Sequence, residues 1–450
     1  MPNRKQPGLT AQLKDKLIQQ ALEKKLKRAE KSDIAASPTR RTGAALDNIS
    51  EQFCSFSLHP GYQQIRIING GAERMGIENP FFRTHGGVAG ATTIIQGKQY
   101  LNYASYNYLD CSGDPQVNMA AQKAIDRYGT SVSASRLVSG ERPVHRQLEK
   151  ALAQFYEVDE AIVLVSGHAT NVTTIGYLFG PRDLVLHDDL IHNSILQGIS
   201  LSGARRLPFA HNDWQALEAI LNEQRHHFER VLIVVEGLYS MDGDFPELPR
   251  YIELKKKYKA FLMVDEAHSL GVMGERGGGI REHFGVAGSE VDIWMGTLSK
   301  TLAGCGGYIA GETALIEHLK FLVPGFLYSV GMSPPLAAAS LKALSILQQE
   351  PERVAALQRN GQLFLKLARE AGIDVGTSEG LAVIPVITGS SIRAARLSAA
   401  LFARRINVLP ILYPAVPEKA ARLRFFVSCR HTEAQIRETV EILSEELDRL

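Results

Sequence analysis

Lys300 is the residue of this sequence with the clearest potential for chemistry. It follows an apolar run, Val291 to Met295, that is typical of a buried strand, and it precedes the glycine-rich stretch Gly304-Cys305-Gly306-Gly307. A lysine held between a core strand and a glycine loop is shielded from water, which disfavours its ammonium form and leaves a nucleophilic amine. Such an amine can form a Schiff base with a carbonyl cofactor. The alternative is an ordinary surface lysine after a strand, so the neighbouring motifs must decide.

A carboxylate at the end of another strand favours the chemical interpretation. Asp265 directly follows the apolar run Phe261 to Val264, and Lys300 comes one strand later. This order suits pyridoxal 5'-phosphate (PLP), since the lysine can hold the cofactor covalently. The carboxylate can keep the pyridine nitrogen protonated, which makes the ring an electron sink.

Three further elements suit the same cofactor. Ser166, Gly167 and His168 follow a strand and open a helix, where backbone amides can bind a phosphate dianion. Thr297 could add a hydroxyl to this phosphate site, and His192 is placed to stack on the ring.

Each of these elements also has a plain structural explanation. His192 could be a core histidine with satisfied hydrogen bonds, and Ser166-Gly167 is a common turn. Asp265-Glu266-Ala267-His268 could bind a metal ion, but no third ligand motif lies nearby in the sequence. Taken together and in this order, the elements favour a PLP site.

The elements that must position these residues alternate between helix and strand from about residue 115 to 345. Pro143 to Tyr156 has the periodicity of a helix. Short strands that are apolar throughout predict a mainly parallel sheet covered on both faces, an α/β fold whose ligands sit at the carboxyl ends of the strands. These predicted strands are Ala161–Val165, Leu184–Leu186, Val231–Val235, Phe261–Val264, Ile293–Met295 and Tyr308–Ala310.

The sequence divides into four predicted parts. Residues 1–45 read as a basic amphipathic helix and a linker, and residues 46–114 as an N-terminal segment with short strands such as Gln64–Ile68 and Thr92–Ile95. Residues 115–345 form the predicted PLP-binding large domain, and residues 346–450 a smaller α+β domain. In the latter, Thr432 and Gln435 form the capping box of a last helix.

Composition excludes several classes of protein. The 450 residues are 45% hydrophobic and 22% charged, with a net charge of +2, so no global field attracts nucleic acid. The sequence contains no apolar run of about 18 residues and no signal-peptide pattern, so we expect neither a membrane span nor export. Four widely spaced cysteines fit reduced thiols in the cytoplasm.

From about residue 98 to the end, the chain resembles the α-oxoamine synthases, which are fold-type I PLP-dependent enzymes. This family includes aminooxononanoate synthase, 2-amino-3-ketobutyrate ligase, 5-aminolevulinate synthase and serine palmitoyltransferase. The resemblance rests on motifs in series: Asn107-Tyr108-Leu109, Ser135-Arg136-Leu137-Val138-Ser139-Gly140, Ser166-Gly167-His168-Ala169-Thr170-Asn171, His192-Asn193-Ser194, Glu236-Gly237-Leu238-Tyr239-Ser240-Met241-Asp242-Gly243, Val264-Asp265-Glu266-Ala267-His268 and Thr297-Leu298-Ser299-Lys300.

The resemblance implies a PLP-dependent acyltransferase that joins an acyl thioester to a small amino acid, with loss of CO2, to give an α-amino ketone. It implies that Lys300 binds the cofactor and then removes the Cα proton, and that Asp265 stabilises the resulting carbanion. Arg424 would grip the substrate carboxylate, and Arg422 is expected to be a surface charge. The remaining implied site residues are Asn107 and His192 beside the carboxylate, and His268 and Ser240 at the cofactor phenolate oxygen.

The resemblance also implies a homodimer whose sites lie at the subunit interface. A hydroxyl from the neighbouring subunit commonly reaches the phosphate, but Val330 and Gly331 stand where relatives often carry Thr or Ser, which leaves Ser329 as the candidate. Ser135 stands where glycine-specific 5-aminolevulinate synthases carry threonine. The smaller side chain would leave space for a substrate Cβ, so we expect alanine or serine rather than glycine.

The sequence leaves the acyl donor, the exact PLP reaction and a non-catalytic role open. The acyl donor is expected to be an acyl-carrier-protein thioester, because carrier proteins are acidic and the tail is basic, with acyl-CoA as the second candidate. A different PLP reaction, such as aldol cleavage of a β-hydroxy amino acid, would use the same lysine, aspartate and histidine. A non-catalytic partner subunit is the third possibility, although such subunits lose the lysine that this chain keeps at position 300.

Overall fold

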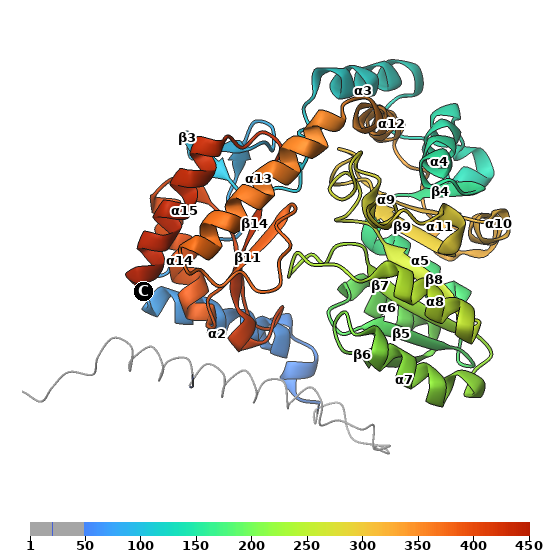
Figure 1. Cartoon of the computed structure of the whole chain (residues 1–450), viewed down its shortest axis with the longest axis horizontal. Helices are drawn as coiled ribbons and strands as arrows, with labels where there is room; N and C mark the ends of the chain where they lie inside the picture. Colours follow the sequence, from blue (N-terminus) through green and yellow to red (C-terminus); the bar gives the residue numbers. More distant parts are fainter. Residues whose placement is uncertain (1–19, 21–48) are drawn as a thin grey trace, which may run out of the picture.

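Figure 1 shows the computed structural model, which describes Gln20 and residues 49–450. The predicted basic tail, residues 1–45, lies outside the described residues except for Gln20, which is helical. Within this described part, no helix is both long and apolar enough to cross a membrane.

A seven-stranded sheet forms the centre of the residues predicted as the large domain, in the order β4-β10-β9-β8-β7-β5-β6. Neighbouring strands from β9 to β6 run parallel, and β10 runs antiparallel to both of its neighbours. The predicted α/β class with a mainly parallel sheet is therefore confirmed. The strands are β4 (Glu160–Leu164), β5 (Leu184–Asp188), β6 (Arg205–Phe209), β7 (Val231–Glu236), β8 (Phe261–Asp265), β9 (Ile293–Thr297) and β10 (Gly307–Gly311).

Strand β6 has no counterpart among the predicted strands. It lies at the edge of the sheet, where Arg205, Arg206 and Pro208 are exposed. An edge strand buries only part of its surface, so it need not be apolar and gives no continuous hydrophobic run.

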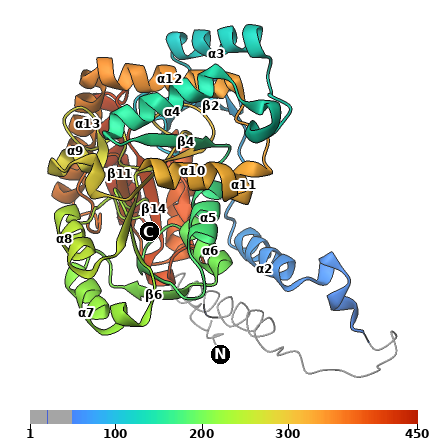
Figure 2. The ribbon, with the colours of Figure 1, turned by 90° about the vertical axis from the view of Figure 1, so that its right-hand side faces the viewer.

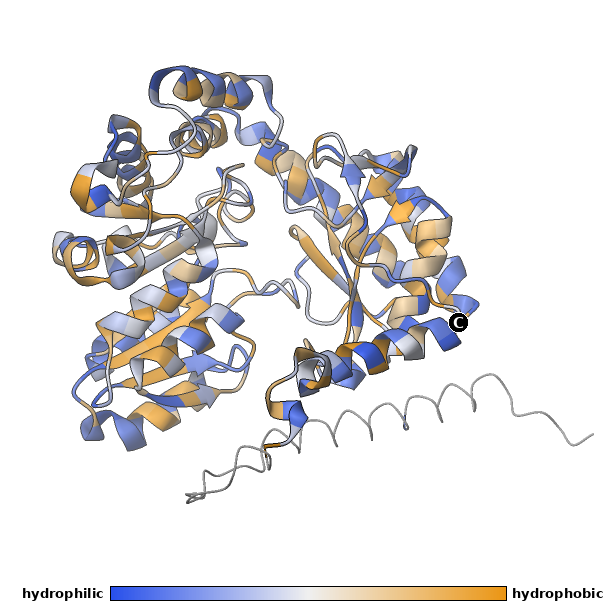
Figure 3. Ribbon diagram, turned by 180° about the vertical axis from the view of Figure 1, so that it is seen from behind, coloured by the Kyte–Doolittle hydropathy of each residue, from blue (hydrophilic) through white to orange (hydrophobic). Residues whose placement is uncertain are grey.

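Helices cover both faces of the sheet, as Figure 2 shows. Alternate residues of one strand enter two separate cores: Ile233 and Val235 of β7 pack in one, and Leu232 and Val234 in the other. In Figure 3 several strands of this sheet are largely in the hydrophobic colour. Helices α5 and α6 cover one face, with α4, α7 and α8 on the other. The helices are α3 (Pro115–Tyr128), α4 (Pro143–Tyr156), α5 (Gly167–Leu178), α6 (Asn193–Ser202), α7 (Trp214–Gln224), α8 (Leu248–Tyr258), α9 (Gly279–Phe284), α10 (Thr313–Leu322), α11 (Pro324–Leu327) and α12 (Pro334–Gln349).

The N-terminal segment and the C-terminal part of the chain share a sheet, in the order β1-β2-β3-β12. Strand β3 (Lys98–Asn102) pairs in parallel with β12 (Ile406–Asn407), and the buried Tyr103 hydroxyl lies 3.0 Å from Thr439 Oγ1. The other elements of this segment are α2 (Pro60–Arg74), β1 (His85–Gly86) and β2 (Thr92–Ile95).

The predicted strand at Gln64–Ile68 is wrong, because these residues lie inside α2. Pro60 occupies the first turn, and the ring of His59 accepts a hydrogen bond from the Gly61 amide at 3.1 Å. These two helix-start signals outweigh the strand preference of three isoleucines.

The last part of the chain builds a three-stranded antiparallel sheet, β11-β14-β13, with helices α14 and α15. Thr432 and Gln435 form the predicted capping box, with bonds of 3.0 and 3.2 Å. Helix α13 (Pro351–Glu370) runs from the large domain to this sheet (Figure 1). The remaining elements are β11 (Val383–Ile387), α14 (Ser391–Ala403), β13 (Pro410–Ile411), β14 (Arg422–Phe426) and α15 (Glu433–Asp448).

Candidate active site

The carboxyl ends of β7, β8 and β9 surround a cavity of about 290 Å³. The structure brings most of the predicted cofactor residues to this one place, although they are distant in sequence. The lining includes Ser166, Gly167, His168, His192, Asp265, His268, Thr297 and Lys300. No group of three His, Cys, Asp or Glu side chains that could hold a metal ion occurs in the part of the chain that is described.

Lys300 follows β9 and turns back toward the cavity. Its Nζ lies 5.7 Å from the centre of the Tyr106 ring, which covers it on the side of the N-terminal segment. Burial lowers the pKa of Lys300 to about 8, although the carboxyls of Asp265 and Glu236 favour the charged form. About a tenth of this amine is therefore neutral and nucleophilic at pH 7, far more than for an ordinary lysine.

Asp265, at the end of β8, is 4% exposed. Its two oxygens accept hydrogen bonds of 2.9 Å from the Asn171 side chain and from the Ala267 amide. Within residues 49–450, no Lys, Arg or His nitrogen pairs with this carboxylate. A buried carboxylate without a cation fits a protonated pyridine nitrogen, which would supply the missing charge.

One end of the cavity is the helix start that is predicted to bind the phosphate. The Ser166 hydroxyl caps α5 by accepting from the Ala169 amide at 3.3 Å, which leaves the amides of Gly167 and His168 as donors. A Cβ at position 167 would lie 2.8 Å from Thr297 Oγ1, so only glycine allows this close approach. Thr297 Oγ1 also lies 2.7 Å from Ser299 Oγ, which adds a second hydroxyl to the cavity.

A hydrogen-bond chain that the sequence did not predict connects Asp265 to His192. The side-chain amide nitrogen of Asn171 donates to Asp265 and to Ser194 Oγ, both at 2.9 Å. Ser194 Oγ lies 2.7 Å from Nδ1 of His192, the residue that caps α6. Burial lowers the pKa of His192, so the ring is neutral and its orientation is fixed from one side. Asn171 and Ser194 belong to two of the motifs of the family resemblance, but their spacing in the sequence does not predict this contact.

Glu236 is a second unpredicted member of the site. It ends β7, pairs in register with Asp265 and lines the cavity. Burial and the neighbouring Asp265 raise the pKa of Glu236 well above its usual range, which favours its protonated form.

Arg424, on β14, is half-buried at the side of the small domain. One guanidinium nitrogen donates to the Ser240 carbonyl at 3.0 Å, while the buried Nε has no hydrogen-bond partner among the described residues. Burial lowers the pKa of Arg424, and its positive charge also lowers the pKa of Lys300, His192 and His268. Ser240 is buried and contacts Arg424 through its backbone carbonyl, and neither residue is among those that line the cavity.

Arg422 was expected to be a surface charge, and this is wrong. Its side chain is 8% exposed and pairs with Asp242 at 2.6 Å. Arg422 lies two positions before Arg424 and therefore on the same face of β14. The segment after β7 covers this face.

Asn107 and Ser135 do not line the cavity of the single chain. The Asn107 side chain instead holds its own loop, donating to the Ala89 carbonyl at 2.8 Å and accepting from the Ser112 amide at 3.0 Å. Ser135 precedes the π-helical turn η4 (Arg136–Gly140), whose Leu137 and Val138 are exposed.

The comparison with known proteins decides the family. The family model for aminotransferases of class I and II matches residues 98–443. The chain belongs to this family. Over 350 residues it is 42% identical to the 8-amino-7-oxononanoate synthase of Fervidobacterium nodosum, an alignment that covers 77% of the chain and 88% of that protein.

Two solved structures place this aminotransferase-family member in a narrower group. A high-resolution structure of SPT with PLP matches with a TM-score of 0.82 at 27% identity, covering 86% of this chain and 97% of that one. The 8-amino-7-oxononanoate synthase of Francisella tularensis matches with a TM-score of 0.67 at 26% identity, covering 78% and 98%. The chain is therefore an α-oxoamine synthase, a PLP-dependent acyltransferase that condenses an amino acid with an acyl thioester and releases CO2.

The residues of this α-oxoamine synthase fit PLP. A buried lysine, an unpaired buried carboxylate and a helix start with free amides surround one cavity. When bound, PLP supplies an electron sink for negative charge on the amino-acid Cα.

Proposed function

We propose that this enzyme joins alanine or serine to an acyl thioester and releases an α-amino ketone. The observation that carries this proposal is Arg424, a half-buried guanidinium that pairs with no carboxylate among residues 49–450. It lies close enough to Lys300 and His268 to affect the pKa of both. A cation in such surroundings favours an anionic ligand, and a carboxylate is the group that a guanidinium fork binds best.

Each side chain of the site has a separate role in the reaction. Arg424 binds the substrate carboxylate and so orients the Cα proton. Lys300, with its lowered pKa, accepts that proton, while Asp265 keeps the cofactor nitrogen charged. His192 would pack over the ring of the bound cofactor and His268 would face the oxygen atoms on which negative charge develops, since both side chains line the cavity.

The names of relatives support the choice of amino acid. In 8-amino-7-oxononanoate, the carbon that bears the amino group carries one further carbon and adjoins the ketone, which is the product expected from alanine. Serine is the amino acid named in serine palmitoyltransferase, to which solved neighbours belong. Both substrates have a Cβ, in agreement with the smaller Ser135 side chain.

Steady-state kinetics with alanine, serine and glycine test this assignment. We expect thioester-dependent CO2 release with alanine or serine, and an Arg424→Gln variant whose kcat/KM for that amino acid falls roughly a hundredfold, about 3 kcal/mol. Arg424→Lys keeps the charge but loses the fork, so it should lose only about tenfold. Activity with glycine alone would refute the amino-acid choice, and aldol cleavage of a β-hydroxy amino acid without a thioester would refute the reaction.

The acyl donor is proposed to be a thioester on an acidic acyl carrier protein, which the basic residues of the N-terminal tail would attract. Deleting residues 1–42 should raise the KM for the acyl carrier protein severalfold and leave the KM for acyl-CoA unchanged. Equal effects on the two donors would contradict this proposal.

A homodimer is proposed from an exposed apolar surface, which we call the η4–α11 surface. It comprises Leu137, Val138, Phe321, Leu322, Tyr328 and Val330, each between 49% and 86% exposed. Apolar groups gathered on one face are typical of a subunit interface. Ser135 and Ser329 border this surface, so dimerisation could bring them to the site of the neighbouring subunit.

Sedimentation velocity tests the dimer. We expect the mass of two chains for the natural protein and of one chain for a Val138→Asp/Tyr328→Asp double variant, because two buried charges destabilise an interface. Phe53→Asp, which changes a side chain that is also exposed but lies outside the η4–α11 surface, is the matched control and should remain a dimer. A single-chain mass for the natural protein would contradict the proposal.

A further inference from the structure

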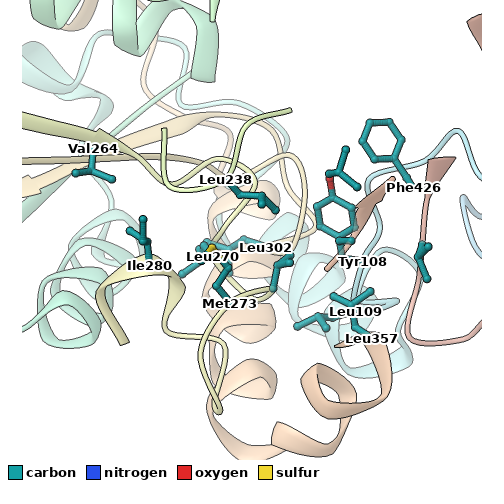
Figure 4. Close-up of a cluster of buried hydrophobic side chains, with 14 of the residues drawn as sticks. Tyr108, Leu109, Leu238, Val264, Leu270, Met273, Ile280, Leu302, Leu357 and Phe426 are labelled. Carbon is teal, nitrogen blue, oxygen red and sulfur yellow. The ribbon is translucent and has the colours of Figure 1, made fainter. Parts of the chain in front are cut away.

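A buried tyrosine that does not itself line the cavity contacts the site histidine. The Tyr108 hydroxyl lies 2.8 Å from Nδ1 of His268. Tyr108 follows β3 in the N-terminal segment and is 0% exposed, whereas His268 follows β8 in the large domain and is 7% exposed. Figure 4 shows Tyr108 beside Phe426 at the edge of the hydrophobic core.

The direction of this hydrogen bond follows from what each group can donate. Burial raises the pKa of the Tyr108 phenol, so it keeps its proton, and His268 Nδ1 is its only hydrogen-bond partner in the described structure. Burial and the charges of Lys300 and Arg424 lower the pKa of His268 well below its usual range, so the ring carries one proton. A buried hydroxyl donates to the available acceptor, and the imidazole proton must then sit on Nε2.

The orientation of the ring makes this proton useful. His268 lines the cavity, and its Nδ1 is already bonded to Tyr108, which leaves Nε2 as the ring nitrogen that can bond to a ligand there. The Phe426 ring lies nearly parallel to the imidazole, at 14° and 6.2 Å between centroids, and the Tyr106 ring meets it edge-on at the same distance. These contacts restrict rotation of the imidazole.

We propose that Tyr108 is a positioning residue that holds His268 in the Nε2–H form and thereby presents a neutral N–H donor to an oxygen atom in the cavity. This proposal rests on the proposed function only for the identity of that oxygen, which is the cofactor phenolate or the thioester carbonyl. A neutral donor stabilises developing negative charge without adding a third cation beside Lys300 and Arg424.

Nitrogen-15 NMR of histidine-labelled full-length enzyme saturated with PLP tests the tautomer directly. We expect the His268 signals, assigned by their loss in His268→Gln, to show a protonated Nε2 and an unprotonated Nδ1. In Tyr108→Phe this pattern should change to a mixture of tautomers. Tyr103→Phe is the matched control, because Tyr103 is equally buried and its hydroxyl contacts Thr439 rather than the site; its spectrum should match that of the natural enzyme.

Kinetics supply the second measurement. Tyr108→Phe should lower kcat roughly a hundredfold while the KM for the amino acid stays within about twofold, since the guanidinium site is unchanged. A proton on Nδ1 in the natural enzyme would overturn the proposal whether or not the variant folds, as would an unchanged tautomer in a folded Tyr108→Phe. Because the spectrum requires no substrate, a wrong substrate assignment would leave this result intact.

Discussion

Replacing Lys300 with alanine is expected to abolish covalent capture of PLP and to lower kcat by roughly a thousandfold or more. The variant loses both the amine that holds the cofactor and the base that takes the Cα proton, and general-base catalysis alone is typically worth about 10²–10⁴. After borohydride reduction, the natural enzyme should gain the mass of one cofactor on the peptide that contains Lys300, and the variant should gain none.

The pH dependence of this capture follows from the pKa of Lys300, about 8. Below this pH the amine is protonated and does not attack the aldehyde, so the rate of capture should rise as the pH increases through about 8 and then level off. Lys255→Ala is the matched control, since Lys255 is also largely buried but pairs with Asp292 at 2.9 Å. Capture that persists in Lys300→Ala would assign the covalent bond to another lysine.

Replacing Asp265 with asparagine is expected to lower kcat/KM by roughly a thousandfold, about 4 kcal/mol. The carboxylate is buried, accepts from Asn171 and Ala267, and has no cation partner among residues 49–450, so its charge is available to the cofactor nitrogen. Asparagine keeps the size of the side chain and removes the charge. Equilibrium dialysis should show weaker PLP binding alongside the kinetic loss.

Asp292→Asn is the control for this second prediction. Asp292 directly precedes β9, so it lies at the amino end of the parallel strands, opposite the end that carries Asp265. Its carboxylate accepts a hydrogen bond from the Leu262 amide at 2.7 Å. It should affect thermal stability rather than kcat/KM. If Asp265→Asn retained the activity of the natural enzyme, the carboxylate would have no role at the cofactor nitrogen.

The seven-stranded sheet could be predicted well because its central strands are buried on both faces. Such strands are apolar throughout, and the polar residues that end them, Asp265 and Thr297 among them, mark the catalytic edge of the sheet. Strand β6 lacked this signal because an edge strand is half-exposed. Within helix α2, the isoleucines of Gln64–Ile68 favour a strand, whereas the proline and histidine at the start of the helix determine its structure.

The contacts between elements could not be predicted from motif order. Glu236 and Asp265 become partners only when β7 and β8 align, and Arg422 meets Asp242 only when β14 reaches the segment after β7. Asn107 had the right motif, yet its amide is engaged by its own loop. Spacing along the chain fixes which residues follow a strand, whereas their partners depend on tertiary packing.

The pairing of β3 with β12 has a consequence for synthesis on the ribosome. Residues 98–102 leave the exit tunnel about three hundred residues before their partners at 406–407. The edge of β3 and the Tyr103 ring therefore lack their partners until nearly the whole chain has been synthesised. The nascent large domain can pack meanwhile, while the N-terminal sheet stays incomplete and exposed to chaperones until translation ends.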